Sequence, residues 1–357
     1  NDILSFAGVS STDSLFGGSG DDSFRFAAEV SRSTVVGGAG NDTLRFVENV
    51  VDASLYGDGG SETGNDVFDV LKTLQGSSIV AGSGNDTITV LTATNAFVSG
   101  DSGQDRVIFT GAVNASTVDL GADADFITLS GTAATSTFKG GDGNDTLIFS
   151  ASLSASSIYG GSGADSVAVL VNQTGLYIEA GTENDTIDLR SVSLSNSTIK
   201  GEDGSDSILL AQNVANSTID FGAGDDSFSF TFALISSSLA GGSGSDSMVI
   251  GGGLTNASIG GGDNSDTVWI NTTLSAGNFV SLDGGSDIAG FSATVGAASV
   301  YGGDGTDSIV FSAAVGAATI DAGASADTMS FGAAVVDARV DAGADADRVI
   351  FASTMSG

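Results

Sequence analysis

The sequence predicts an all-β fold, a parallel β-solenoid of about 18 coils with two short strands in each coil. An aspartate returns every 20 residues, with three one-residue slips and one insertion of four residues, at positions 2, 22, 42, 66, 86, 105, 125, 145, 165, 185, 206, 226, 246, 266, 287, 307, 327 and 347. A repeat of this length is too short for a strand–helix–strand unit, which needs about 30 residues. Each repeat is therefore expected to form one coil that contacts only its neighbours.

Apolar residues recur at fixed distances from each aspartate. The second and fourth residues after it are apolar in every repeat, as in Leu44 and Phe46, and ten of the 18 residues at the fourth position are Phe. This alternation predicts a strand with one buried face. A second apolar column lies seven residues before the aspartates, and a looser one eight residues after them, as in Val35 and Val50. Stacked coils are then expected to form Phe and Ile ladders in the core.

Glycines precede each aspartate and predict a tight turn, because glycine permits the positive φ that such turns need. The four extra residues fall within 58–63 and are expected to form a small loop at this glycine-turn edge. No linker or change of composition interrupts the period. We therefore interpret residues 1–357 as a single domain, with the insertion in the coil that ends at Asp66.

Composition narrows the classes of function. A net charge of −34, with 10 Lys and Arg residues, makes nucleic acid and anionic membranes poor partners. The chain lacks cysteine and histidine, so it has no disulfide, no thiolate metal site and none of the commonest catalytic bases. No apolar run approaches the roughly 18 residues of a membrane-spanning helix. The chain begins inside a repeat and not with Met, so we expect a processed or partial chain.

Stacking of the coils places the aspartates in a row, about one strand spacing apart. Like charges at this distance repel, so the row must bind a cation, accept hydrogen bonds from turn N–H groups, or take up protons. The available ligands are carboxylate and carbonyl oxygens, which suit a hard cation such as Ca²⁺. A purely hydrogen-bonded aspartate ladder is the alternative.

The motif Gly-Gly-x-Gly-x-Asp-x-apolar resembles the nonapeptide of the repeats-in-toxin, or haemolysin-type, calcium-binding proteins. The match is strongest in the turns that end at Asp22, Asp42, Asp145, Asp165, Asp246 and Asp307. The resemblance implies a β-roll with many Ca²⁺ ions between consecutive turns, held by aspartate carboxylates and turn carbonyls of two coils. Family members usually carry the motif on both edges of the roll. Here it occurs once in 20 residues, so only one edge is expected to bind Ca²⁺.

The calcium ligands that the resemblance implies are Asp22, Asp42, Asp66, Asp86, Asp105, Asp145, Asp165, Asp206, Asp226, Asp246, Asp266, Asp287 and Asp307. Weaker candidates are Asp125, Asp185, Asp327 and Asp347, because Asp123, Glu183, Ser325 and Asp345 replace the third glycine of their turns. Asn264 replaces it before Asp266. No residue is assigned to catalysis or to an organic cofactor, and we do not expect an enzyme.

The repeat also resembles long cyanobacterial haemolysin-like proteins of the oscillin type, for example in the second turn at residues 313–320. Those proteins form surface fibrils on gliding filaments. The resemblance implies a non-catalytic, extracellular structural protein, such as a fibril, sheath or S-layer subunit, secreted by the type I route. A calcium-dependent adhesin rod and the secretion region of an exported toxin or hydrolase are the alternatives. Expected partners are further copies, end to end or laterally, and surface polysaccharide. Trp269, at an outward position, is weak evidence for a contact.

Overall fold

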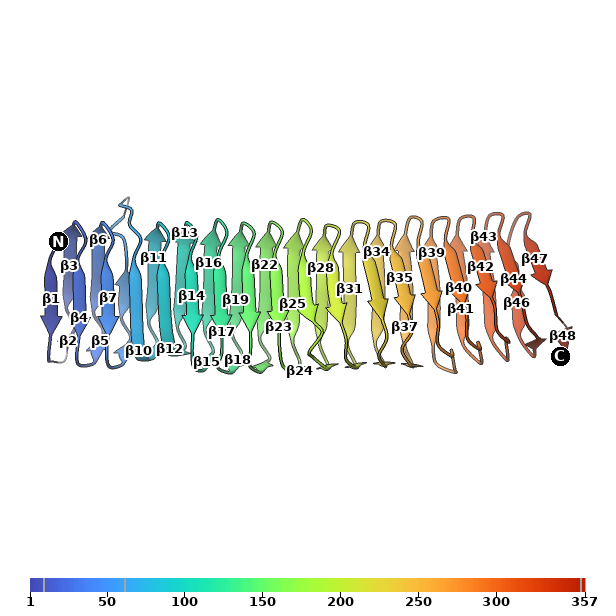
Figure 1. The fold of residues 1–357 in the computed structure, drawn as a ribbon, viewed down its shortest axis with the longest axis horizontal. Coiled ribbons are helices and arrows are strands. Elements are labelled where there is room, and N and C mark those ends of the chain that lie inside the picture. Colours follow the sequence, from blue (N-terminus) through green and yellow to red (C-terminus); the bar gives the residue numbers. More distant parts are fainter. Residues whose placement is uncertain (9, 61, 354, 357) are drawn as a thin grey trace. The chain divides into compact units, whose positions relative to one another are not determined.

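The computed structural model describes residues 1–8, 10–60, 62–353 and 355–356. In this part of the chain the regular secondary structure consists of β-strands alone. The strands pair in parallel, and the backbone makes about 17 turns. The predicted parallel β-solenoid is therefore confirmed (Figure 1). The chain divides into two compact units, Asn1–Gly181 and Thr182–Gly357. The described residues contain no helix that is long and apolar enough to cross a membrane.

In the first unit each coil has a strand after the aspartate, a corner region and a strand before the next glycine turn. The post-aspartate strands are β1 (Ile3–Phe6), β4 (Ser23–Phe26), β7 (Thr43–Phe46), β10 (Val67–Gln75), β12 (Thr87–Thr94), β14 (Arg106–Phe109), β17 (Phe126–Leu129), β20 (Thr146–Phe149) and β23 (Ser166–Val169). The corner strands are β2 (Ser10–Ser11), β5 (Val30–Ser31), β8 (Val50–Val51), β15 (Val113–Asn114), β18 (Ala133–Ala134), β21 (Leu153–Ser154) and β24 (Gln173–Thr174). The pre-turn strands are β3 (Ser14–Ser19), β6 (Thr34–Ala39), β9 (Ser54–Tyr56), β11 (Ser78–Ser83), β13 (Phe97–Ser102), β16 (Thr117–Ala122), β19 (Thr137–Asp142), β22 (Ser157–Ser162) and β25 (Tyr177–Thr182).

The second unit repeats the three types. Its post-aspartate strands are β26 (Thr186–Leu189), β29 (Ser207–Leu210), β32 (Ser227–Phe230), β35 (Ser247–Ile250), β38 (Thr267–Ile270), β40 (Ile288–Phe291), β42 (Ser308–Phe311), β44 (Thr328–Phe331) and β47 (Arg348–Phe351). Its corner strands are β27 (Leu194–Ser195), β30 (Val214–Ala215), β33 (Leu234–Ile235), β36 (Leu254–Thr255), β45 (Val335–Val336) and β48 (Met355–Ser356). Its pre-turn strands are β28 (Thr198–Asp203), β31 (Thr218–Ala223), β34 (Ser238–Ser243), β37 (Ser258–Asp263), β39 (Phe279–Gly284), β41 (Ser299–Asp304), β43 (Thr319–Ala324) and β46 (Arg339–Asp341).

The two-residue corner strands add to the two strands per coil that the sequence predicts. They form because the looser apolar column lies in them: Val30 and Val50 are both fully buried, and they pair with each other across β5 and β8. Each buried side chain therefore anchors the second turn to the core. Two residues are too few for period-two alternation, so hydrophobic patterning could not distinguish this strand from a turn.

Equivalent residues stack directly on one another in the core. The rings of Phe6 and Phe26 lie 4.8 Å apart, and those of Phe26 and Phe46 lie 4.9 Å apart, each pair stacked. In the second unit Phe291 and Phe311 stack at 4.8 Å. These contacts confirm the predicted Phe ladders, since each strand pairs with its neighbour in register with the repeat.

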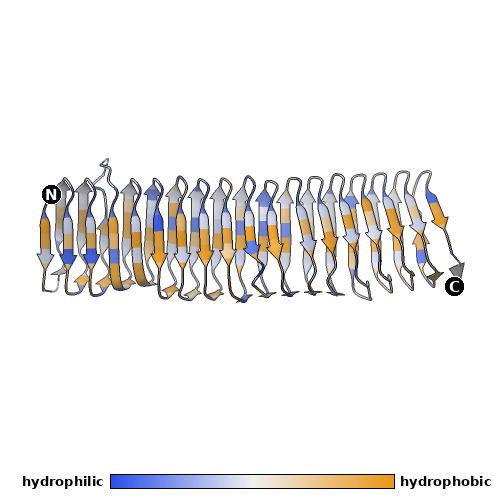
Figure 2. Cartoon of the chain, viewed as in Figure 1, coloured by the Kyte–Doolittle hydropathy of each residue, from blue (hydrophilic) through white to orange (hydrophobic). Residues whose placement is uncertain are grey.

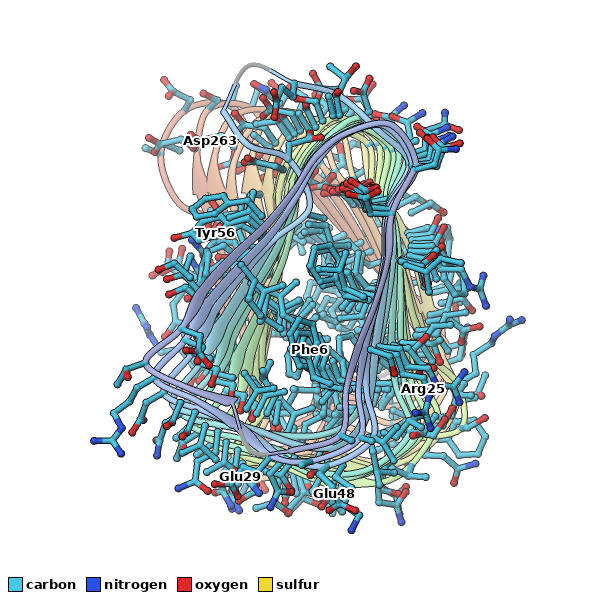
Figure 3. The ribbon with its side chains drawn as sticks, turned by 90° about the vertical axis from the view of Figure 1, so that its left-hand side faces the viewer. Phe6, Arg25, Glu29, Glu48, Tyr56 and Asp263 are labelled. Atoms are coloured by element: carbon cyan, nitrogen blue, oxygen red, sulfur yellow. The ribbon has the colours of Figure 1, made fainter. Side chains whose placement is uncertain are left out.

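The interior and exterior of the coil separate by residue type. Figure 3 shows Phe6 inside the coil and Arg25, Glu29, Glu48 and Tyr56 around its outside. The expected loop lies at the glycine-turn edge, between β9 and β10 (Figure 1). Ser61, within this loop, lies outside the described residues.

A left-handed residue follows the corner region in many coils, and it is often not glycine. Arg32, Ala115 and Ala155 have φ of 49°, 48° and 49°, where Gly76 and Gly175 occupy the equivalent place in other coils. A left-handed conformation costs an ordinary L-residue about 1–2 kcal/mol, and asparagine adopts it more readily than alanine. Stacking on the neighbouring coils therefore holds these residues against their local preference.

Replacing Ala155 with Asn should stabilise the protein by about 0.5–1 kcal/mol, because Asn relieves part of this cost and the side chain is exposed. The midpoint of urea unfolding measures the gain. Ser152→Asn is the matched control, since Ser152 is exposed in the same corner and is not among the positive-φ residues. An equal effect of both substitutions would show that strain at residue 155 is not the cause.

Candidate metal centre

The aspartates of the repeat lie at the end of the glycine turn, directly before the post-aspartate strands. In one coil β19 ends at Asp142, the chain turns through Gly143 and Asn144, and β20 begins immediately after Asp145. Gly141 and Gly143 have φ of 116° and 131°, which L-residues rarely adopt. The turn is glycine-rich for this reason, and it aims the aspartate side chain into the coil.

The row is almost fully buried. Exposure of 1–4% is found for Asp22, Asp42, Asp66, Asp86, Asp105, Asp125, Asp145 and Asp165 in the first unit, and for Asp185, Asp206, Asp226, Asp246, Asp266, Asp287, Asp307 and Asp327 in the second. Asp347 is half-buried and Asp2 is exposed. Each unit therefore brings its predicted ligands into one inward-facing row, and the weaker candidates Asp125, Asp185 and Asp327 occupy the same position as the others.

One oxygen of each carboxylate is used by the backbone. Oδ1 of Asp145 accepts a hydrogen bond from the N–H of Asp125, one coil earlier, at 2.7 Å. The same bond, at 2.5–3.1 Å, reaches Oδ1 of Asp42, Asp66, Asp86, Asp105, Asp125, Asp165, Asp206, Asp226, Asp246, Asp266, Asp287, Asp307, Asp327 and Asp347. The hydrogen-bonded ladder that the sequence left as the alternative thus exists, but it occupies only one of the two oxygens.

The second oxygen, Oδ2, is buried and has no hydrogen-bond partner among the described residues. This holds for Asp22, Asp42, Asp66, Asp86, Asp105, Asp125 and Asp145 in the first unit, and for Asp206, Asp226, Asp246, Asp266, Asp287, Asp307 and Asp327 in the second. A buried charged oxygen without a partner is strongly destabilising. A row of such atoms indicates that something further binds there.

Beside the first glycine of the turn, a small space lies between Oδ2 of the aspartate and a backbone carbonyl oxygen of the next coil. A Cβ atom on Gly140 would lie 2.3 Å from Oδ2 of Asp145 and 2.4 Å from the carbonyl oxygen of Gly160 in the next coil. Among the described residues, ten glycines have both kinds of contact: Gly17, Gly37, Gly57, Gly100, Gly140, Gly160, Gly201, Gly241, Gly261 and Gly302. When the carboxyl group is ionised both oxygens are acceptors, so the arrangement is favourable only with a proton or a cation at this space.

Other coils carry a side chain at this first glycine position. Leu120, Phe221 and Leu282 are buried there, and so are Ala81 and Ala322. Because a Cβ at this position points toward the space, we expect these side chains to compete with a cation for it. Grading the sites by the third glycine missed this position, although the choice between Gly and an apolar residue, five residues before most of the aspartates, was available as a signal.

The third-glycine replacements disturb the turn less than the sequence suggests. Asp123, Asn264 and Ser325 adopt φ of 79°, 78° and 83°, so the turn keeps its left-handed conformation. Asp327, which follows Ser325, still accepts the N–H of Asp307 at 2.8 Å. The turn therefore keeps its conformation despite the energetic cost of left-handed L-residues, and the aspartate stays in the row.

A second ladder beside the row was not foreseen. Asn65 donates its backbone N–H to Oδ1 of Asn41 at 2.7 Å, and Asn85 donates to Oδ1 of Asn65 at 2.8 Å. These asparagines directly precede the aspartates, and their side chains reach the following coil, whereas the aspartates reach the preceding one. Where Asn precedes the aspartate, as in the turns ending at Asp42 and Asp66, the Asn-Asp pair therefore ties the turn to both neighbours.

The atoms around the space that could bind a metal ion are carboxylate and carbonyl oxygens. No three acidic side chains of the described residues converge on one point, so a cation would bind one or two carboxylates and fill its other positions with turn carbonyls. Ca²⁺ takes six to eight oxygen ligands at about 2.3–2.6 Å and accepts carbonyl oxygens, whereas Mg²⁺ requires near-octahedral geometry. Each space offers an orphaned Oδ2 and a carbonyl oxygen, which are ligand types that Ca²⁺ accepts.

The insertion adds one carboxylate to this edge. Oδ2 of Asp58 accepts the N–H of Ser83 at 2.6 Å, and its Oδ1 is buried without a hydrogen-bond partner in the described part of the chain. Burial raises the pKa of Asp58, and the charge of Glu62 raises it further. Asp58 and Glu62 also line an open hollow of about 520 Å³ on the outside of the coil.

Burial raises the pKa of several row aspartates because it removes water from the charged form. The pKa of Asp66 rises to about 7 and that of Asp105 to about 8, and in the second unit the pKa of Asp226 and of Asp307 rises to about 7. The hydrogen bond from the preceding N–H lowers each pKa, and neighbouring aspartates raise it. Without a cation, the row therefore holds protons close to neutral pH.

Without Ca²⁺, the free energy of unfolding should fall as the pH rises from about 5 to 8. The folded carboxyls, with pKa values of about 6–8, bind more protons in this window than unfolded aspartates of pKa 3.8, so raising the pH favours the unfolded chain. Saturating Ca²⁺ should remove the decline, because the cation stabilises the ionised form. Urea unfolding in EGTA and in Ca²⁺ at several pH values measures this, and stability that rises with pH in EGTA would contradict it.

No protein-family model matches the chain, and no curated protein matches it. Among solved structures, the chain is similar to the X-ray crystal structure of a hyperactive, Ca²⁺-dependent, β-helical antifreeze protein from an Antarctic bacterium. The two share 21% sequence identity over 84% of this chain and 81% of that one, with a TM-score of 0.41. Similarity at this level does not establish a shared function.

Proposed function

We propose that this chain is a calcium-stabilised structural protein, in which Ca²⁺ binds along the glycine-turn edge and holds successive coils together. The observation that carries the proposal is the row of buried Oδ2 atoms that face backbone carbonyls beside the turn glycines. Such a pair of acceptors repels unless a positive charge lies between them. Its repetition through each unit favours a role in stabilising the whole fold over a role at one site.

The whole-chain charge supports the same role. A folded chain with a net charge of −34 repels itself, and bound divalent cations reduce that repulsion. Because the unfolded chain has no preformed sites, the free energy of Ca²⁺ binding becomes free energy of folding. The chain would then stay unfolded where Ca²⁺ is scarce and fold where it is abundant.

An extracellular location follows from this dependence. Extracellular calcium modules bind with dissociation constants of about 10⁻⁴–10⁻³ M, well above the range of cytosolic sensors. The resemblance to repeats-in-toxin and oscillin-type proteins supports secretion by the type I route and a place in a surface fibril, sheath or S-layer. The proposed role is non-catalytic, since the repeated carboxylates already bond to the backbone and the chain lacks histidine and cysteine.

Calorimetric titration of the cation-free chain should give about ten Ca²⁺ per molecule, one for each glycine that leaves the space open. Mg²⁺ at the same concentration should bind more weakly, because it tolerates the carbonyl-rich geometry poorly. Gly140→Ala is the matched variant: its Cβ would lie 2.3 Å from Oδ2 of Asp145 and 2.4 Å from the carbonyl oxygen of Gly160, so it displaces these ligands, and the stoichiometry should fall by about one. Absence of Ca²⁺ binding would refute the proposal, and about 16 ions would show that apolar residues at the glycine position do not exclude the cation.

A further inference from the structure

The second unit carries a sheet whose outward face is free of charge over six consecutive strands. The strands β32, β35, β38, β40, β42 and β44 pair in this order. Their outward positions are Ser227, Ser229, Ser247, Val249, Thr267, Trp269, Ile288, Gly290, Ser308, Val310, Thr328 and Ser330. We call this surface the neutral face. Figure 2 colours inward and outward residues together, and β40, β42 and β44 appear mostly pale and orange in it.

The other sheet of the unit is charged at both ends, although the middle outward positions of β34, β37, β39 and β41 are uncharged. On the other sheet of the same unit, outward positions carry Lys200, Asp220, Asp321 and Asp341. None of the twelve outward positions carries an acidic residue, and none carries a Lys or Arg. Arg348, on the next strand β47, ends the neutral region.

A tryptophan lies against the middle of the neutral face. The indole of Trp269 covers Gly290 on the adjacent strand: a Cβ on Gly290 would lie 2.0 Å from its Cζ3 and 2.2 Å from its Cε3. Gly290 is buried as a result, while Trp269 remains 41% exposed. The ring therefore occupies the place of a side chain at residue 290 and lies along the sheet, with Val249 beside it in register.

We propose that the neutral face binds a neutral polysaccharide, with Trp269 as the stacking platform. The C–H groups on one face of a sugar ring are weakly positive and contact the negative face of an aromatic ring favourably. Rows of Ser and Thr hydroxyls on both sides of the ring can donate to and accept from sugar hydroxyls. Val249 and Ile288, both exposed, add apolar contact area next to the ring.

The charge of the molecule selects this occupant over the others. An anionic polysaccharide or a second copy would meet a chain that stays negatively charged even with about ten Ca²⁺ bound, and the face has no cation to offset that repulsion. A basic partner would find no carboxylate on the face. A neutral, hydroxyl-rich chain is the ligand whose charge matches the surface.

Co-sedimentation of the full chain in Ca²⁺ with cellulose powder and with chitin beads tests the proposal, with calcium alginate beads as the anionic comparison. The wild type should bind at least one of the neutral glycans and should not bind alginate. Trp269→Ala should lower the bound fraction about fivefold or more, as loss of a central aromatic contact usually does. Val249→Asp should lower it similarly by placing a charge beside the platform.

Phe279→Ala is the matched control, because Phe279 is 42% exposed and lies on β39 of the other sheet, where it contacts Tyr301. It should bind as the wild type does, and far-UV circular dichroism should show all variants folded. Failure of the wild type to bind either neutral glycan, or equal losses in Trp269→Ala and Phe279→Ala, would overturn the proposal. Sedimentation velocity gives a second result that could overturn the proposal. A dimer that Trp269→Ala abolishes would show that this face is a contact between copies. These outcomes are independent of Ca²⁺ stoichiometry.

Discussion

In EGTA at pH 8 the chain should lose most of its β-structure, and Ca²⁺ should restore it. Each site contributes about 2.7 kcal/mol when free Ca²⁺ is a hundredfold above its dissociation constant. About ten such sites together exceed the 5–15 kcal/mol that separates most folded domains from their unfolded chains. Removing the cations also leaves buried carboxyls such as Asp105, whose pKa rises to about 8, to ionise with Oδ2 unpaired.

Far-UV circular dichroism and thermal melting in EGTA and in Ca²⁺ measure this. Lowering the pH to about 5 in EGTA serves as the control: the carboxyls take up protons there, so part of the β-structure should return without any cation. Mg²⁺ should restore less structure than Ca²⁺ at equal ionic strength. Identical spectra and melting temperatures in EGTA and Ca²⁺ at pH 8 would contradict the calcium requirement.

Asp145→Ala should destabilise the folded chain severely, even with Ca²⁺ present. It removes the acceptor of the Asp125 N–H, and an unpaired buried N–H costs about 1–3 kcal/mol. It also removes Oδ2 from the space beside Gly140, so the contribution of one Ca²⁺, about 2.7 kcal/mol under the same conditions, is lost. We expect a loss of roughly 3–6 kcal/mol in Ca²⁺, measured by urea unfolding.

Two controls separate this effect from a general change of charge. Asp142→Ala removes an exposed carboxylate from the same turn and should change stability by less than about 0.5 kcal/mol. Asp347→Ala removes a row member that is only half-buried, and it should cost less than Asp145→Ala because water reaches that site. Equal losses in Asp145→Ala and Asp142→Ala would show that burial in the row is unimportant.

The fold could be predicted because its signal is repeated in every coil. The alternation of Leu44 and Phe46 would be ambiguous once, but its return every 20 residues leaves room only for a short strand and a turn. The left-handed corner residues were not predictable in the same way. Arg32 and Ala155 have no preference for positive φ, and the stacked neighbours impose it on them.

The row of aspartates was predictable, but its internal geometry was not. Spacing alone places Asp125 and Asp145 in adjacent coils; it does not say that Oδ1 accepts an N–H from the preceding coil while Oδ2 stays buried. The importance of Gly140 also emerged only from the distances to Asp145 and Gly160, since the sequence marks it as one of several turn glycines. These are properties of neighbouring coils in contact, which a single repeat does not contain.

The most direct test of calcium in the row is the melting temperature of Asp145→Asn at about pH 6.5, in EGTA and in Ca²⁺. The amide keeps an oxygen for the Asp125 N–H and adds an N–H that can donate to the carbonyl of Gly160, so it satisfies both groups without a cation. It also cannot carry the negative charge that a cation requires. The variant should melt above the wild type in EGTA and below it in Ca²⁺. A variant that melts on the same side of the wild type in both buffers would contradict cation binding at this aspartate.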